Sequence, residues 1–150
     1  VTTRDLRWKR VDIKSLNLLA PVLAKQFAYE QKAQEAWLVD DDGFITEGSS
    51  SNAWILIGNT VYTRPVSSSI LNGITRKTLM KGLSKYGYKF KEKKFNLKDI
   101  KKSKEAYITS ATQYVMPVIK IDNHKIGNGR VGKFAKQFKD IYLESVQLSD

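Results

Sequence analysis

The chain has 150 residues, which suits one domain with a buried core, and its 26 basic against 15 acidic residues give a net charge of +11. It holds no cysteine, which excludes disulfides and thiolate metal sites, and no apolar run reaches membrane-spanning length. We therefore expect a soluble, cytoplasmic protein with neither a metal site nor a membrane partner.

The positive charge raises nucleic-acid binding as an alternative function. The densest lysine runs, residues 89–94 and 98–104, are interrupted by acids or fall on segments predicted to face solvent, and no recognition motif accompanies them. We therefore favour a lysine-rich solvated surface over a basic nucleic-acid-binding domain, which would bind with a steep salt dependence.

The first thirty residues predict a strand followed by a helix. Alternating side chains predict the strand over residues 3–11, and apolar spacing predicts the helix over 16–32, or from near Ala20 because Pro21 suits a first helical turn. The apolar face of this helix would comprise Leu19, Val22, Leu23, Ala24 and Phe27. Lys14 would then lie between strand and helix, where a rigid scaffold can direct it into a cleft.

Two hairpins are predicted next. In the first, strands at 36–39 and 44–47 flank an acidic turn, and in the second, strands at 53–57 and 60–63 flank Gly58-Asn59. The acidic turn lacks the alternating ligands and the distant glutamate of a calcium loop, so we expect an ordinary hairpin turn there.

The second half continues the mixture of helices and strands. The predicted elements are a helix over 75–86, a strand over 88–95, a short helix from the Asn96 cap to Ile100, strands over 106–109 and 115–121, a hairpin return at 124–126, and a helix over 131–146. This order predicts an α/β or α+β domain with a mixed sheet and flanking helices. The single histidine, His124, would be a surface turn residue.

Polar patches interrupt this pattern at Lys14, at residues 46–52, at 72–76 and, more weakly, at 110–112. A lysine can form a Schiff base with an aldehyde, and a glutamate at a strand end can hold a positively charged ring nitrogen. A helix start opened by glycine offers free N–H groups to a phosphate. Each patch alone has an ordinary explanation as solvated charge, turn or helix cap, but together they favour pyridoxal 5'-phosphate as a cofactor.

Four stretches carry a family resemblance: Asp5-Leu6-Arg7-Trp8, residues 12–19, residues 46–52 and residues 70–76. They resemble the class IV pyridoxal-phosphate aminotransferases, and within that family the D-amino acid (D-alanine) type. The resemblance implies that residues 1–150 form the larger, C-terminal cofactor domain, with a partly barrel-like mixed sheet. It also implies a smaller N-terminal domain outside this chain and a homodimer. We expect an exposed surface where that domain or a partner subunit would pack.

The resemblance also implies roles for individual residues. Lys14 would form the Schiff base and shuttle the proton at the substrate Cα, and Glu47 would keep the pyridine nitrogen protonated. The remaining cofactor contacts would be Ser50 in the pocket, Leu71 against the ring face, Gly73, Ile74 and Thr75 at the phosphate, and the turn of Ser110, Ala111 and Thr112 beside it. Relatives commonly have threonine where Ala111 stands, so Ser110 or Thr112 would supply that contact.

The implied reaction is transamination of a D-amino acid, of the D-alanine type, with a 2-oxo acid such as 2-oxoglutarate. Branched-chain aminotransferases of the class carry a tyrosine five residues after the lysine, where this chain has Leu19. The branched-chain type and aminodeoxychorismate lyase remain alternatives within the family. A fold-preserving, non-catalytic relative is a further alternative, against which the intact Lys14 and Glu47 argue.

Overall fold

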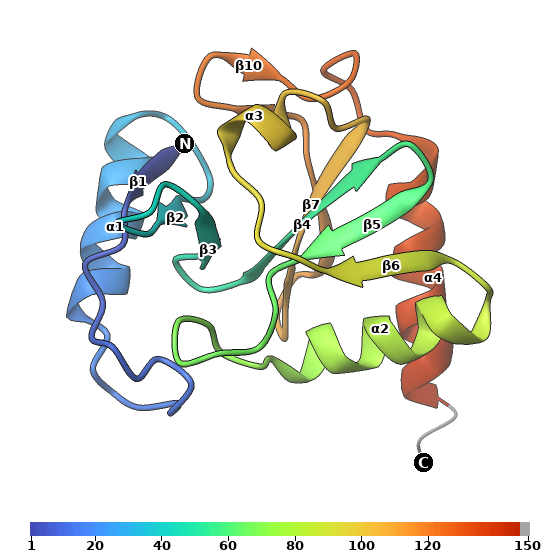
Figure 1. The fold of residues 1–150 in the computed structure, drawn as a ribbon, viewed down its shortest axis with the longest axis horizontal. Coiled ribbons are helices and arrows are strands. Elements are labelled where there is room, and N and C mark those ends of the chain that lie inside the picture. Colours follow the sequence, from blue (N-terminus) through green and yellow to red (C-terminus); the bar gives the residue numbers. More distant parts are fainter. Residues whose placement is uncertain (148–150) are drawn as a thin grey trace.

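The computed structural model describes residues 1–147 and divides the strands among three sheets (Figure 1). The helices are α1 (Leu19–Glu30), α2 (Ile74–Lys85), α3 (Leu97–Ile100) and α4 (Lys133–Gln147). The strands are β1 (Thr2–Arg4), β2 (Trp37–Val39), β3 (Ile45–Gly48), β4 (Asn52–Ile57), β5 (Thr60–Thr63), β6 (Lys89–Glu92), β7 (Glu105–Ser110), β8 (Tyr114–Val118), β9 (Lys120–Ile121) and β10 (His124–Lys125). Within this part of the chain, no helix is long and apolar enough to span a bilayer.

The largest sheet has five strands in the order β6-β5-β4-β7-β8, with α2 and α4 packed on one face (Figure 1). In this sheet, as described over residues 1–147, β5 and β6 pair in parallel and the other pairs are antiparallel; α2 provides the long crossover that a parallel pair requires. Successive side chains of β4 alternate between two cores. Trp54 packs with α2 and α4, whereas Ile55 packs in a second core on the opposite face.

The smaller sheet has the order β1-β2-β3 and is covered by α1. Here α1 buries two alanines, Ala24 and Ala28, against Ala36 and Leu38 of the sheet. The apolar face predicted for this helix is therefore wrong except for Ala24. Its other members are exposed: Leu19 by 69%, Val22 by 57%, Leu23 by 53% and Phe27 by 38%. Small alanines allow the helix to approach the sheet closely, and the large side chains find no cover within residues 1–147.

The predicted fold class, a mixed α/β domain with flanking helices, is confirmed, although the sheets do not close into a barrel within the described residues. The hairpins β2–β3 and β4–β5 form as expected. The Asn96 cap of α3 is present and forms a reciprocal capping box with Asp99. The first strand is the main error, because β1 ends at Arg4 and residues 5–18 form a loop.

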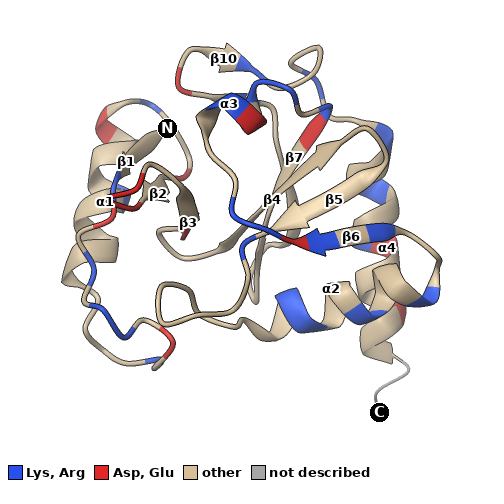
Figure 2. Ribbon diagram, in the orientation of Figure 1, with Lys and Arg blue, Asp and Glu red and all other residues tan. Residues whose placement is uncertain are grey.

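Lysines and arginines are spread over several elements, including β6, α2 and the loop before α1, with acidic residues among them (Figure 2). This distribution agrees with a solvated lysine-rich surface.

Candidate active site

Glu47, near the end of β3, is the centre of the polar site. Only 3% of this residue is exposed, yet both carboxylate oxygens have hydrogen-bond donors. The Asn52 side-chain amide donates to Oε2 at 2.7 Å, and the Leu71 backbone N–H donates to Oε1 at 3.1 Å. The Arg7 guanidinium forms an ion pair with Oε1. Three separate segments thus fix the orientation of one buried carboxylate.

Arg7 reaches this site from the loop that follows β1. Its side chain is 8% exposed, and its guanidinium donates to Asp5 at 2.8 Å and to the Ser69 carbonyl at 3.1 Å, besides pairing with Glu47. These bonds hold the loop that follows the end of β1 at Arg4 against the Glu47 site. Arg7 lies in residues 5–8, one of the stretches that carry the family resemblance. The alternating side chains around it predicted a strand and did not indicate that Arg7 is buried against Glu47.

Burial raises the pKa of Glu47 to about 6, because desolvation of the carboxylate outweighs the opposing positive charge of Arg7. The Arg7 and Thr46 hydrogen bonds keep the pKa of the neighbouring Asp5 carboxyl below its usual value, despite its burial. At neutral pH both carboxyl groups are therefore ionised. An ionised Glu47 is the form that can accept a hydrogen bond from a protonated ring nitrogen.

The Glu47 pKa predicts a pH effect on stability. Because the folded pKa of about 6 lies above the unfolded value of 4.5, the folded chain retains a proton that the unfolded chain releases between these pH values. The contribution of Glu47 to the free energy of unfolding should fall by about 2 kcal/mol as pH rises through this window. Glu47→Gln, which cannot ionise, should lack this term. Urea unfolding of both proteins at pH 4 and pH 7 measures it, and a pH-independent difference between them would contradict the assignment.

Asn52 connects two of the predicted polar patches, residues 46–52 and residues 72–76. Its amide donates both to Glu47 and to the Leu71 carbonyl, the latter at 2.8 Å. A Cβ at Gly73 would lie 2.6 Å from the Asn52 Oδ1, so this approach of the α2 start to β4 requires glycine. Asn52 also lies opposite Thr109 in the β4–β7 ladder, which brings the turn at Ser110 to the same end of the sheet. Asn52 stood within a predicted patch, but the sequence alone assigned it no role.

The start of α2 fits an anionic group. Among residues 1–147 no side chain caps this helix, and its first turn carries no acid, so its leading N–H groups are left for an external acceptor. Thr75 is 2% exposed, and its hydroxyl has no hydrogen-bond partner among the described residues. A buried hydroxyl without a partner is costly, so this one is suited to a ligand oxygen. The site therefore provides a carboxylate for a ring nitrogen and a hydroxyl with a helix start for a phosphate.

The structure does not link Lys14 to this site by any contact. Lys14 is exposed in the loop of residues 5–18, and its amine has no polar partner among residues 1–147. Its predicted place at the end of a strand is therefore wrong. Two attachments nevertheless hold the part of this loop that precedes Lys14: Arg7 bonds Glu47, and the Val11 N–H donates to the Ser68 carbonyl at 3.0 Å. Lys14 follows this second attachment by three residues.

The remaining predicted residues are exposed or half-buried. Ile74 is 68% exposed at the first position of α2, and Leu71 is half-buried beside Glu47. Ser50 is exposed, and its hydroxyl lies 3.4 Å from a carboxylate oxygen of Glu35. At the end of β7, the Ser110 and Thr112 hydroxyls lie 3.4 Å apart around the exposed Ala111. The individual roles of these residues stay predictions.

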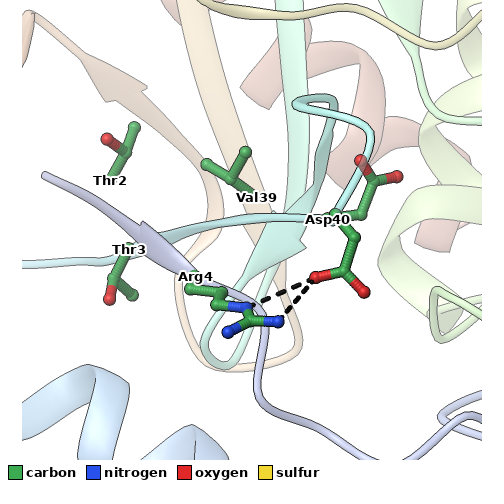
Figure 3. A pocket seen from close by; sticks show the side chains of 6 residues that line it. Thr2, Thr3, Arg4, Val39 and Asp40 are labelled. Carbon is green, nitrogen blue, oxygen red and sulfur yellow. Dashed lines mark hydrogen bonds and ion pairs between the residues drawn. The ribbon is translucent and has the colours of Figure 1, made fainter.

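A surface hollow beside β1 and β2 lies apart from these residues (Figure 3). It is lined by Thr2, Thr3, Arg4, Val39, Asp40 and Asp41. An exposed ion pair crosses it between Arg4 and Asp41 at 3.0 Å. None of the predicted cofactor residues lines this hollow, so it does not compete with the Glu47 site.

Residues 1–121 match the family described as amino-transferase class IV. The chain belongs to this family. Class IV aminotransferases depend on pyridoxal 5'-phosphate, so the predicted family and its cofactor are confirmed.

Curated class IV relatives are named as D-alanine aminotransferases. The protein from Staphylococcus aureus (strain N315) is 43% identical over 148 residues, which cover 97% of this chain and 52% of the relative. The protein from Bacillus licheniformis is 42% identical over 146 residues, covering 97% of this chain and 51% of the relative. The chain thus spans about half the length of the curated relatives it matches.

Solved structures of class IV branched-chain aminotransferases share the fold. The T.th. enzyme with pyridoxamine 5'-phosphate has a TM-score of 0.81 and 30% identity, covering 85% of this chain and 42% of its own. The Thermobaculum terrenum enzyme in its PLP form has a TM-score of 0.87, covering 99% of this chain and 51% of its own. The latter is 24% identical and supports the fold alone.

Proposed function

We propose that the protein containing this chain transfers an amino group from a D-amino acid, of the D-alanine type, to a 2-oxo acid such as 2-oxoglutarate. The observation that carries the proposal is the buried Glu47 carboxylate, held by Asn52, Leu71 and Arg7, together with the buried Thr75 hydroxyl, which has no partner among residues 1–147. The D-alanine type is supported by the relatives' names at 43% and 42% identity and by Leu19 in place of the branched-chain tyrosine.

Pyridoxal 5'-phosphate, when bound, supplies an electron sink for chemistry at the substrate Cα. Glu47 would accept a hydrogen bond from the ring nitrogen and, as an anion, hold its proton. The N–H groups at Ile74 and Thr75 and the Thr75 hydroxyl would bind the phosphate, with Gly73 permitting the approach. Further contacts would come from Leu71 against the ring, Ser50 at the pocket wall, and Ser110, Ala111 and Thr112 beside the phosphate.

Lys14 would carry the amine that links to the cofactor aldehyde and then moves a proton at the substrate Cα. For this role the Lys14 segment must lie against the Glu47 site. Its attachments through Arg7 and Val11 support that placement. The exposed apolar residues on the same segment and on α1 suit a covering domain or subunit.

The larger organisation stays a prediction. The chain would be the C-terminal cofactor domain, with a smaller N-terminal domain outside it, in a cytoplasmic homodimer. The relatives, about twice as long as the matched region, support this organisation.

Thr75 provides a prediction with opposite effects on stability and binding. Thr75→Val removes a buried hydroxyl that has no partner in the described part of the chain, so the chain without cofactor should become about 1 kcal/mol more stable. The same change should weaken pyridoxal-phosphate binding roughly tenfold, because one phosphate contact is lost. Urea unfolding and a fluorescence titration measure the two effects. Thr78→Val, on the next turn of α2, is the control and should leave the affinity unchanged.

The substrate is tested by assaying the full-length protein with D-alanine and 2-oxoglutarate, against L-leucine and L-valine. The expected result is activity with D-alanine. Exclusive use of L-leucine or L-valine would assign the protein to the branched-chain type, which the fold of the T.th. enzyme also supports. Aminodeoxychorismate lyase activity would be detected as release of pyruvate when aminodeoxychorismate is the substrate and neither D-alanine nor an amino acceptor is present. Absence of every activity, with cofactor bound, would favour the non-catalytic relative.

A further inference from the structure

A second buried carboxylate, Glu35, lies just before β2 on the far side of the turn that follows Glu47. The residue is 9% exposed. Its Oε1 accepts the Ser49 hydroxyl and the Ala36 N–H at 2.9 Å, and its Oε2 accepts the Ser51 hydroxyl at 3.0 Å. Sequence reasoning gave Glu35 no role, since its partners lie 14 to 16 residues further along the chain.

These bonds hold the one turn that connects Glu47 to Asn52. Residues 48–51 form that turn, closed by the Gly48 N–H, which donates to the Ser51 carbonyl at 2.7 Å. The Ser49 N–H donates to the Ala36 carbonyl at 2.9 Å, which attaches the turn to the chain beside Glu35. A Cβ at Gly48 would lie 2.1 Å from the Ser51 hydroxyl, so this packing of the turn requires glycine at its first position. The positions of both turn ends therefore depend on the Glu35 carboxylate.

The three serines of the turn are not equivalent. Ser49 and Ser51 are buried and bonded to Glu35, whereas Ser50 is exposed with only a 3.4 Å contact. Ser50 is thus the serine with a hydroxyl available for a ligand, while its neighbours anchor the backbone on either side. Lys25, whose amine lies 3.5 Å from Oε1, is 47% exposed and contributes a solvated charge.

We propose that Glu35 is a positioning residue for the cofactor site: by fixing the serine turn it holds Asn52 in place and orients Glu47 toward the ring nitrogen. This inference rests on the proposed function, because it presupposes that Glu47 binds a pyridine ring. Residues that orient a ligand-binding group through hydrogen bonds alter ligand affinity when they are removed. Comparing two ligands that differ at the ring nitrogen, on the same variant, separates this role from a general loss of folding.

The test compares pyridoxal 5'-phosphate with its analogue in which a CH group replaces the ring nitrogen. Dissociation constants are measured for both ligands by fluorescence titration of the full-length protein, with unfolding curves recorded in parallel. The wild-type chain should prefer pyridoxal phosphate by at least about tenfold, the size of a charge-assisted hydrogen bond. Glu35→Ala should reduce this preference to within about threefold, and Glu35→Gln, which retains one acceptor oxygen, should keep most of it.

Two controls isolate the cause. Lys25→Met removes the charge near Glu35 but none of the hydroxyl bonds, and it should retain the wild-type preference. If Glu35→Ala does not fold, Ser51→Ala is tested in its place. This substitution removes one of the bonds to Glu35 and should also lower the preference for pyridoxal phosphate over the analogue.

The outcomes separate the inference from the proposed function. A Glu35→Ala chain that weakens both ligands equally, or keeps the full preference, would overturn the positioning role while leaving the proposed function intact. A wild-type full-length protein that binds neither ligand, or binds both equally, would overturn the proposed role of Glu47 and the Glu35 inference with it.

Discussion

In the full-length protein, pyridoxal phosphate followed by borohydride should label Lys14, and Lys14→Ala should abolish that label. The phosphate and ring contacts at Thr75 and Glu47 would hold the aldehyde near Lys14, which raises its effective concentration far above that at other exposed lysines. In the full-length protein, Lys14→Ala should lower transamination by roughly a thousandfold or more, as expected when the covalent nucleophile is lost. Mass spectrometry of digested protein locates the label.

Lys9 provides a matched control for this experiment, because it lies in the same loop with a side chain that is 91% exposed. Lys9→Ala should leave the Lys14 label unchanged. Labelling chiefly at another lysine, or equal labelling of many lysines, would remove Lys14 from its assigned role.

Arg7→Met should destabilise the chain by about 3–5 kcal/mol, the cost of leaving buried charges without their partner. The change leaves the carboxylates of Asp5 and Glu47 buried together, where Arg7 had bonded to both. Denaturant unfolding at pH 7 measures the loss. It should shrink at acidic pH, where both carboxyl groups can take up protons.

Arg4→Met is the control for Arg7→Met, because the Arg4–Asp41 pair is 72% and 62% exposed. Exposed ion pairs contribute about 1 kcal/mol or less. Equal costs for the two substitutions would show that Arg7 does not stabilise the site. The double variant Arg7→Met/Glu47→Met should recover part of the loss, since it removes one of the unpaired charges.

Elements with strong local signals were predictable from the sequence. The α4 stripe of Phe138, Ile141 and Tyr142 is buried as its spacing indicates, and the Asn96 cap and the Gly58-Asn59 turn lie where their chemistry requires. The importance of Glu47 and Thr75 came from the combination of patches and from the family resemblance. The structure adds the buried setting that makes each of them chemically useful.

The rest depended on contacts between distant segments, which local patterns do not encode. Arg7 lies in a sequence that alternates like a strand, and its inward turn is set by Glu47, 40 residues away. Glu35 has no neighbour in the sequence that reveals its serine partners. The apolar spacing of α1 indicated a buried face of large side chains, but in this chain the alanines pack instead. A pattern predicts that a face will be covered without predicting which segment covers it.

The alanine contact of α1 has a consequence for the motion of the chain. Two small side chains bury little apolar surface, so α1 should open locally at a low free-energy cost compared with α2 and α4, which share the large aromatic core. The amide hydrogens of α1 should therefore exchange with solvent faster than those of α2 and α4. The segment that carries Lys14 leads directly into this helix. If a covering domain or subunit slows amide exchange in α1, it should therefore also restrict the motion of the Lys14 segment.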